Sequence, residues 1–456
     1  MTLRIGLLLL AGGMLCSTCV WAQNDTGTSD NQAPTQTGPK PSFIYPDAKP
    51  SLDFLSPALE NSSITLGIST GFSYDSYAYS YTSNGQDFWL FTVGPSISIR
   101  KIRPNLTWNV SYSVGYQKYT QLSGPGNPNN NLLAQRASAG FLWQMAPRWQ
   151  LMGSDGFSYS ADPLGSYLAT PGTPTMNNPN PVTYYPLTQY TQNYATLTLN
   201  DELSKVDTLS FNGTANLRQT STYNLLSTVP FYNLTSYGGR ASYSHQFSPR
   251  LSLGAGYDYN SLDFGSGQQR SGIQTISLTA DYLIRPNMTI SGWIGPQYTS
   301  TKTVLGIPIL GQIVYFTTYN SLWSTAVGAN FGWRGLRDSF QAGFSRGVSD
   351  GGGIVATAQV NSVTGQYRRQ LNPKMDATLG AGYTHVVSIA TSSRSFDNFT
   401  VHAGLSYKLA RSLNATAQYA HVHQTQSSAF LLGTGNYDSN IVGVSISYTW
   451  THPLGR

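Results

Sequence analysis

Apolar side chains fall on every second position through much of the chain, and residues 273–298 show this pattern most clearly. Ile276 and Leu278 alternate with Thr and Ser, and the alternation resumes after a Pro-Asn turn at Pro286. A period of two is the spacing of a β-strand with one apolar and one polar face. Proline and asparagine are typical of tight turns. The stretch predicts a hairpin, and its recurrence over residues 64–450 predicts a long antiparallel meander.

Two folds can bury such apolar faces: a soluble sandwich or barrel with the apolar side chains inside, or a membrane barrel with them outside. The connections between the predicted strands favour the second. One set is short and often contains Pro or a basic residue, at residues 102–105, 146–148, 204–207, 248–250, 284–287, 334–338, 372–374 and 410–412. The alternate set is longer and rich in Gly, Pro, Asn and Ser, as at residues 121–132, 161–188, 221–233, 301–316 and 426–437. Short turns at one end and long loops at the other are typical of an outer-membrane barrel with its turns in the periplasm.

Eight short turns and nine longer loops predict an all-β fold, a transmembrane antiparallel up-and-down β-barrel of about 18 strands. Both chain ends would then lie in the periplasm. Sixteen strands is the alternative if residues 149–159 do not form a complete strand.

Composition and charge placement agree with a barrel whose apolar face meets lipid. Only 10% of the 456 residues are charged, whereas soluble domains carry about 25%. A charge on the lipid side would cost roughly 2–4 kcal/mol at the bilayer midplane. Several charged residues fall on the polar faces and are therefore candidate pore-lining residues: Arg136, Arg218, Arg240, Asp258, Asp281, Asp376 and His402. Tyr and Trp recur near strand ends, as interfacial girdles require, although strand propensity also favours them there.

The N-terminal residues predict export. Arg4, an apolar run at residues 5–15 and a small-residue cleavage pattern ending at Ala22 identify residues 1–22 as a signal peptide. Residues 23–60 are predicted to be a disordered or extended periplasmic segment, whose last ten residues either pack at the barrel mouth or act as a loose tether. Residues 61–456 form the predicted barrel domain. No later stretch has the roughly 18 consecutive apolar residues of a membrane helix.

The last predicted strand carries the most specific family signal. Val442, Val444, Ile446, Tyr448 and Trp450 alternate with polar residues or Gly, and this stretch resembles the C-terminal assembly signal of Gram-negative outer-membrane barrels. Six residues follow Trp450, where such barrels usually end on the aromatic residue. The resemblance implies a porin-like protein of the cell outer membrane. It also implies contact with outer-membrane lipid and lipopolysaccharide and with the barrel-assembly machinery.

Candidate chemistry is sparse. The two cysteines, Cys16 and Cys19, lie in the predicted signal peptide, so the mature chain would have no disulfide and no thiol ligand. His421 and His423 are two apart and could share a metal, but no third ligand is evident, which favours solvated histidines. The six histidines have no recognisable catalytic context, and we expect neither an enzyme nor a cofactor. A formal charge of +6 without a basic cluster argues against nucleic-acid binding.

These observations predict an outer-membrane pore through which small hydrophilic solutes diffuse passively, lined mostly by neutral polar groups. The alternative is an outer-membrane barrel that serves as a partner in envelope polysaccharide export or surface attachment. The loop at residues 162–188 resembles the constriction loop of general porins in its order and length, and Asp162 is its only charge. An external cap is the alternative role for that loop.

Overall fold

The computed structural model describes residues 62–76, 88–120, 131–160, 189–221, 233–265, 267–309, 312–351, 355–389, 395–426 and 437–454. The predicted signal peptide at residues 1–22, the predicted periplasmic segment at residues 23–60 and the predicted constriction loop at residues 162–188 lie outside these ranges, so all three stay predictions.

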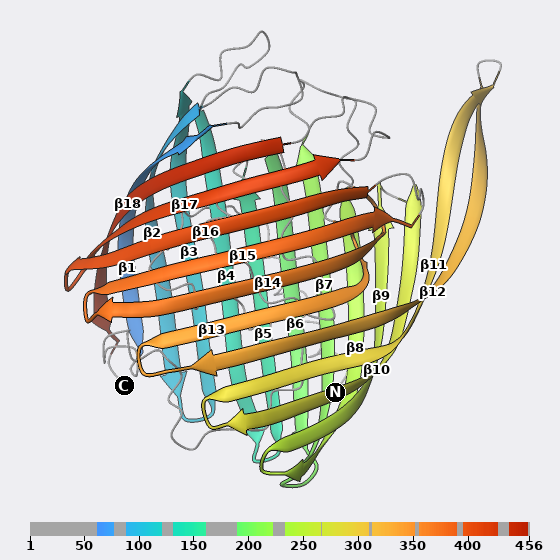
Figure 1. Cartoon of the computed structure of the whole chain (residues 1–456), viewed down its shortest axis with the longest axis horizontal. Coiled ribbons are helices and arrows are strands. Elements are labelled where there is room, and N and C mark those ends of the chain that lie inside the picture. Colours follow the sequence, from blue (N-terminus) through green and yellow to red (C-terminus); the bar gives the residue numbers. More distant parts are fainter. Residues whose placement is uncertain are drawn as a thin grey trace, which may run out of the picture.

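Eighteen β-strands among the described residues form one closed antiparallel sheet (Figure 1). The strands are β1 (Ser63–Asp75), β2 (Phe88–Arg103), β3 (Leu106–Thr120), β4 (Asn131–Ala146), β5 (Trp149–Ser160), β6 (Gln189–Glu202), β7 (Asp207–Ser221), β8 (Leu234–Ser248), β9 (Leu251–Phe264), β10 (Gln269–Arg285), β11 (Met288–Ile309), β12 (Gln312–Arg334), β13 (Asp338–Ser349), β14 (Ala358–Asn372), β15 (Met375–Ser388), β16 (Ser395–Ala410), β17 (Leu413–Gln426) and β18 (Tyr437–Pro453). Each strand pairs with its chain neighbours, and β1 also pairs with β18 along its whole length, which closes the ring.

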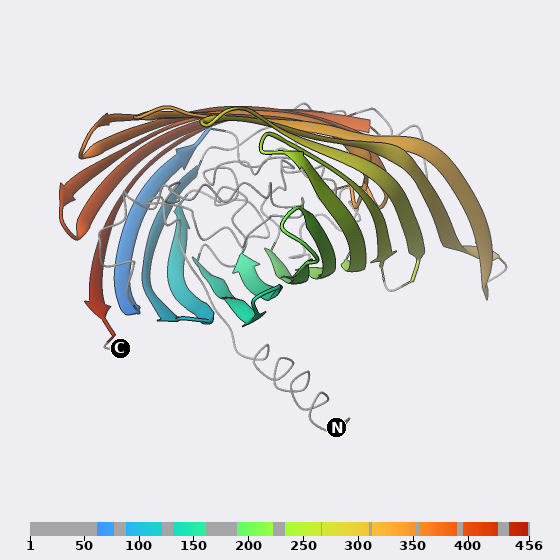
Figure 2. The ribbon, with the colours of Figure 1, turned by 90° about the horizontal axis from the view of Figure 1, so that it is seen from below.

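The strand count confirms the predicted 18-stranded barrel. Residues 149–160 form the complete strand β5, so the 16-strand alternative is wrong. Short turns join β2 to β3, β4 to β5 and each later even-numbered strand to the next, up to β16 and β17, as predicted. The blue to green strands β1–β9 form an arc, and the orange strands lie opposite them across the interior (Figure 2).

One predicted loop is wrong. Residues 301–316 were expected to be a long connection because Gly306 and Pro308 are turn-forming residues. Instead, β11 continues to Ile309 and β12 begins at Gln312. The β-branched and aromatic residues of this stretch favour extended backbone strongly enough to outweigh the Gly and Pro.

The barrel exposes its apolar side chains and buries its polar ones, which is the reverse of the arrangement in a soluble protein. On β10, Ile276 and Leu278 are 60% and 64% exposed, whereas Ser277 between them is fully buried. Inward hydroxyl groups bond across neighbouring strands, as Ser271 of β10 does with Thr301 of β11 at 3.0 Å. Apolar side chains therefore form a continuous outer belt around a polar interior. Within the described residues, no helix is long and apolar enough to cross a membrane.

Polar acceptors at the edges of the belt are held by a recurring arrangement that we call the rim clasp. An outward carboxylate or amide faces a His or Arg on a neighbouring strand, and a Tyr two residues before that basic residue also contacts it. The four clasps are Asp207 with Tyr243 and His245, Asp338 with Tyr367 and Arg369, Asp397 with Tyr383 and His385, and Asn440 with Tyr419 and His421.

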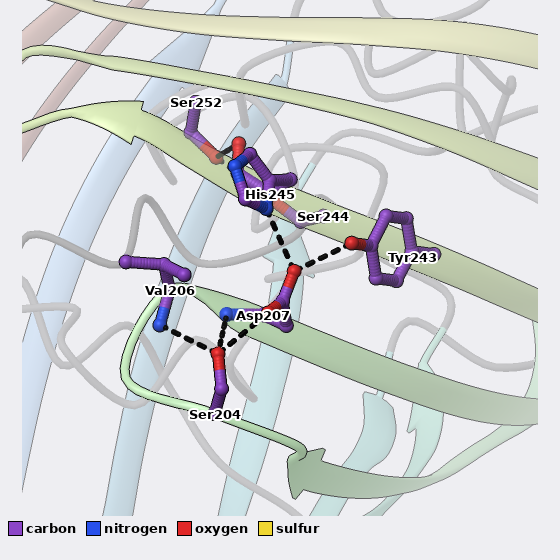
Figure 3. Close-up of polar contacts among 7 residues, drawn as sticks. All are labelled: Ser204, Val206, Asp207, Tyr243, Ser244, His245 and Ser252. Carbon is purple, nitrogen blue, oxygen red and sulfur yellow. Dashed lines mark hydrogen bonds and ion pairs between the residues drawn. The ribbon is translucent and has the colours of Figure 1, made fainter.

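The clasp at Asp207 shows how the group is satisfied (Figure 3). The Tyr243 hydroxyl donates to Asp207 Oδ1 at 2.5 Å, and His245 Nδ1 lies 2.7 Å from the same oxygen. Ser204, in the turn before β7, donates from Oγ to Asp207 Oδ2 at 2.5 Å. Each carboxylate oxygen therefore has a hydrogen-bonding partner within the protein at the edge of the apolar belt.

We expect Asp207→Ala to lower the thermal unfolding temperature of the barrel more than Asp207→Asn does. The amide oxygen of Asn440 accepts from a tyrosine in the same geometry, so an amide at position 207 retains one contact. Alanine removes the acceptor from both Tyr243 and His245. Circular dichroism melts in detergent would measure the difference. Equal melting temperatures for the two variants would contradict this account of the clasp.

Candidate functional site: the barrel interior

A buried ion pair lies on the inward faces of β8 and β9. Arg240 and Asp258 are direct cross-strand partners, and Arg240 Nη1 lies 3.7 Å from Asp258 Oδ1. Their side chains are only 5% and 3% exposed. The two residues follow the inward register of their strands, since the outward neighbours Tyr257 and Tyr259 are both well exposed. Burial makes this pair depend on mutual compensation, because either charge alone would be poorly solvated.

A second ion pair joins parts of the wall that are not adjacent. Arg218 of β7 places Nη1 3.2 Å from Oδ2 of Asp350, which directly follows β13. Because β7 and β13 are not neighbours in the sheet, the end of β13 must reach into the interior to make this contact. Gly351 then adopts a φ of 55°, a conformation that suits Gly and lets the chain turn at this point.

Near its end, β13 separates from β12 while it stays paired with β14 up to Ser349, opposite Ala358. Among the described residues it pairs with β12 only up to Arg346, opposite Val327. Beyond that point the Val348 backbone N–H donates to Oε1 of Gln297, an inward side chain of β11, at 2.8 Å. Gln297 is itself fixed by donating from Nε2 to the Thr275 hydroxyl at 3.1 Å. The inward face of β11 thus receives the end of β13.

Thr357, just before β14, also lies against the inward side of β10. Gln269 Nε2 donates to the Thr357 hydroxyl at 3.2 Å, and the Ser271 hydroxyl lies 2.7 Å from it. An apolar cluster packs beneath the connection, comprising Leu234, Leu262, Phe264, Ile273, Val348 and Ala356, all at least nine-tenths buried. We call residues 346–350 and 355–357 the inward segment. It covers the interior side of β8–β11 near the ends of the strands that carry the longer loops.

The other candidate residues are spread around the wall. Arg136 of β4 lies opposite Ser113 and Ser158 and is exposed to the interior. Asp281 of β10 is buried between Ser252 and Ser291.

The last two candidates, Asp376 and His402, lie on the neighbouring strands β15 and β16. Asp376 of β15 forms an ion pair at 3.6 Å with Arg368 of β14. His402 of β16 lies over Gly380, where an added Cβ would come within 2.1 Å of the imidazole. Of the seven candidates, the structure brings only Arg240 and Asp258 together.

The histidines that were considered as metal ligands contact a carboxylate. His421 and His423 lie 3.7 Å and 3.4 Å from Asp438 through their Nδ1 atoms, on the outward face of β17 and β18. Even so, the described part of the chain contains no group of three or more His, Cys, Asp or Glu side chains placed to hold a metal.

The Ser204, Asp207 and His245 cluster has the composition of a hydrolase triad but different contacts. A nucleophilic serine is hydrogen-bonded to the imidazole, which is in turn bonded to the acid. Here Ser204 and His245 both contact Asp207, and Ser204 Oγ also accepts from the backbone N–H groups of Val206 and Asp207 at 3.1 Å each (Figure 3). The hydroxyl closes a turn, and the arrangement does not activate it.

The sequence did not point to the inward segment. Asp350 precedes three glycines, which indicated only a flexible hairpin loop. Its partner Arg218 lies far away in sequence and on a strand that is not a neighbour, so strand register could not pair them. The inward position of Arg368, unlike the position of Asp350, could be predicted from the sequence, because it follows from the alternation of β14 around Val363.

The closed 18-stranded ring, with its apolar outer belt and polar interior, is that of a porin-like outer-membrane β-barrel protein. No family model and no curated protein matches the chain. Its fold is similar to that of the outer membrane protein OpdK from Pseudomonas aeruginosa, at 13% identity over 86% of this chain and 99% of that chain, with a TM-score of 0.42. Acinetobacter baumannii OccAB4 matches at 10% identity over 86% and 98% of the two chains, with a TM-score of 0.42. Pseudomonas aeruginosa OpdQ matches at 11% identity over 86% and 99%, with a TM-score of 0.43.

We expect Asp258→Ala to destabilise the barrel by on the order of 3 kcal/mol, because it leaves a buried guanidinium without its carboxylate. The double variant Arg240→Ala/Asp258→Ala should recover part of that loss, since it removes both charges. Urea unfolding in lipid vesicles would measure the free energies. A double variant that loses the sum of the two single effects would contradict the coupling.

Proposed function

We propose that this protein is an outer-membrane pore through which small hydrophilic solutes diffuse passively. The observation that carries the proposal is the closed ring of 18 strands with a polar inward face. Barrels of 16–18 strands enclose more space than their wall side chains can fill and leave an aqueous channel. The short turns and both ends of the mature chain would face the periplasm, as short turns do in bacterial barrels.

The inward charges support a pore with little preference for either sign of ion. Arg218 pairs with Asp350, Arg240 with Asp258 and Arg368 with Asp376, so these three cations each have an anion beside them. Among the other buried residues, those with hydroxyl or amide side chains outnumber the apolar ones, which include Phe396 and Val422. Uncharged polar solutes would meet hydrogen-bonding groups here without a strong electrostatic barrier.

In this proposal the inward segment narrows the pore. Its Asp350–Arg218 ion pair joins it to β7. Its hydrogen bonds to Gln297, Gln269 and Ser271 join it to β11 and β10. The seven candidate pore-lining residues would lie along the channel, with Arg218, Arg240 and Asp258 nearest to the constriction.

We expect the purified protein to open stepwise channels in planar bilayers, and Asp350→Ala to shift their reversal potential in a KCl gradient toward anions. The substitution removes the carboxylate beside Arg218 and releases one anchor of the inward segment, so single-channel conductance should also rise. Asp263→Ala is the matched control, because Asp263 pairs with Arg270 on the outward side of β9 and β10. A wild-type protein that forms no channels would contradict the pore proposal. An Asp350→Ala channel with the conductance and reversal potential of the wild-type channel would show that the inward segment does not narrow the pore.

The proposed orientation predicts which ends of the strands can be labelled on intact cells. Thr317→Cys, on β12 at the long-loop end, should react with a membrane-impermeant maleimide, whereas Lys374→Cys in the short turn before β15 should react only after the outer membrane is permeabilised. Both native cysteines lie in the predicted signal peptide, so the mature chain should give no background. The reverse labelling pattern would show that the short turns face outward.

A further inference from the structure

The hairpin of β11 and β12 extends beyond the rest of the wall (Figure 1). Pairing of β11 with β10 ends at Thr303. Among the described residues, pairing of β12 with β13 is confined to Val327–Arg334, and β12 from Gln312 to Ala326 pairs only with β11. We call residues 300–309 and 312–323 the outer ribbon. It lies at the end of the barrel that carries the longer loops; residues 300–303 still pair with β10, and beyond Thr303 the outer ribbon is two-stranded.

The apolar belt ends where the outer ribbon begins. Tyr259, Gln274, Tyr298 and Trp323 lie in one row across β9–β12. On the belt side of this row the outward residues include Ile276 and Ile294, which are 60% and 55% exposed. On the far side the outward positions of β11 begin with Ser300 and Lys302 and continue with Val304, opposite Thr317. Tyr298 and Trp323, whose rings are 5.0 Å apart, therefore mark the headgroup level.

Two further aromatic side chains continue outward from that level on the same face. Tyr319 and Tyr315 are 77% and 69% exposed, in line with Trp323 at 70%. Successive members are four residues apart, or about 13 Å along a strand, which puts Tyr315 about 27 Å beyond Trp323. Residues this far from the hydrocarbon cannot serve as girdle anchors, so their exposure needs another explanation.

The chemistry of this face is specific. Ser321 and Thr317 alternate with the aromatic rings, and Lys302 lies directly opposite Tyr319. The outer ribbon contains no Asp or Glu, and Lys302 is its single charged residue. Flat rings match the apolar C–H faces of sugars, hydroxyl side chains match sugar hydroxyls, and an ammonium matches a phosphate. The face complements an anionic, phosphorylated saccharide.

We propose that the outward face of the outer ribbon binds the phosphorylated saccharide headgroup of lipopolysaccharide in the surrounding leaflet. The proposal rests on the orientation given above, in which this end of the barrel faces the cell exterior. Trp323 would lie at the level of the lipid headgroup, and Lys302, Tyr319 and Tyr315 would follow the saccharide chain outward. The barrel would thereby hold part of its own lipid annulus in place.

A protein strand is the competing occupant, because the edge of β12 is a template for strand addition. Such a strand would pair with the backbone edge and would leave the rings of the outward face uncovered. Pairing of two β12 edges from two copies is also disfavoured. Copies in one membrane are related by an axis along the membrane normal, and this axis cannot make the two strands antiparallel.

The test is a binding titration of the purified full-length mature protein by native mass spectrometry from detergent. One probe is lipopolysaccharide with its core saccharide, and the other is lipid A without it. We expect the wild-type protein to prefer the saccharide-bearing lipid by about tenfold, and Tyr315→Ser/Tyr319→Ser to lose that preference. Phe316→Ser is the matched control, since Phe316 is an exposed aromatic residue on the other face of the same strand.

Retention of the preference in Phe316→Ser and its loss in the double tyrosine variant would support the proposal. Absence of a preference in the wild-type protein, its persistence in the double variant, or its loss in Phe316→Ser would overturn it. Channel conductance of the double variant should equal that of the wild-type protein. A silent barrel that still prefers the saccharide-bearing lipid would overturn the pore function and leave the ribbon site standing.

Discussion

Hydrocarbon offers a peptide group no hydrogen-bonding partner, and the rest of this structure follows from that constraint. The chain meets it by pairing β18 with β1 over the whole length of β1, from Ser63 opposite Pro453 to Asp75 opposite Ile441. Once the ring is closed, side-chain alternation must place one face toward lipid and the other toward the interior. The exposed Ile276 and Leu278 and the buried Ser277 between them are direct consequences.

The rim clasps show how the same constraint applies where lipid gives way to water. An outward carboxylate beside the apolar belt needs partners that the bilayer cannot supply. In each clasp the tyrosine bridges diagonally to the acceptor, while the His or Arg lies directly across from it. Asn440 occupies the same position as Asp207, Asp338 and Asp397, which indicates that an oriented acceptor oxygen is the common requirement. Negative charge is optional at this position, and the interfacial tyrosines have a hydrogen-bonding role besides their affinity for headgroups.

The parts of the molecule that follow from period-two alternation could be predicted from the sequence. The hairpin around Pro286, the 18 strands and the inward positions of Arg240 and Asp258 all depend on local register. The inward segment could not be predicted, because Asp350 meets Arg218 only after β13 has separated from β12, and no local pattern encodes that separation. The prediction of a loop at residues 301–316 was wrong for a related reason. Gly306 and Pro308 are tolerated in a strand that lies outside a continuous sheet, where a missing ladder bond can be replaced by water.

The inward segment and the outer ribbon both begin where β13 separates from β12. When β13 turns inward after Arg346, β12 loses its second partner beyond Val327, and the rest of β12 can be held only by β11. This separation begins opposite Ile294, four residues on the belt side of Trp323, and most of the β12 edge without β13 lies beyond the row that contains Trp323, where it can be hydrated. A departure nearer the middle of the belt would expose backbone groups to lipid at a cost of several kcal/mol each. The boundary of the membrane therefore limits how far down the wall β13 can separate from β12, and with it both the depth of the inward segment and the length of the outer ribbon.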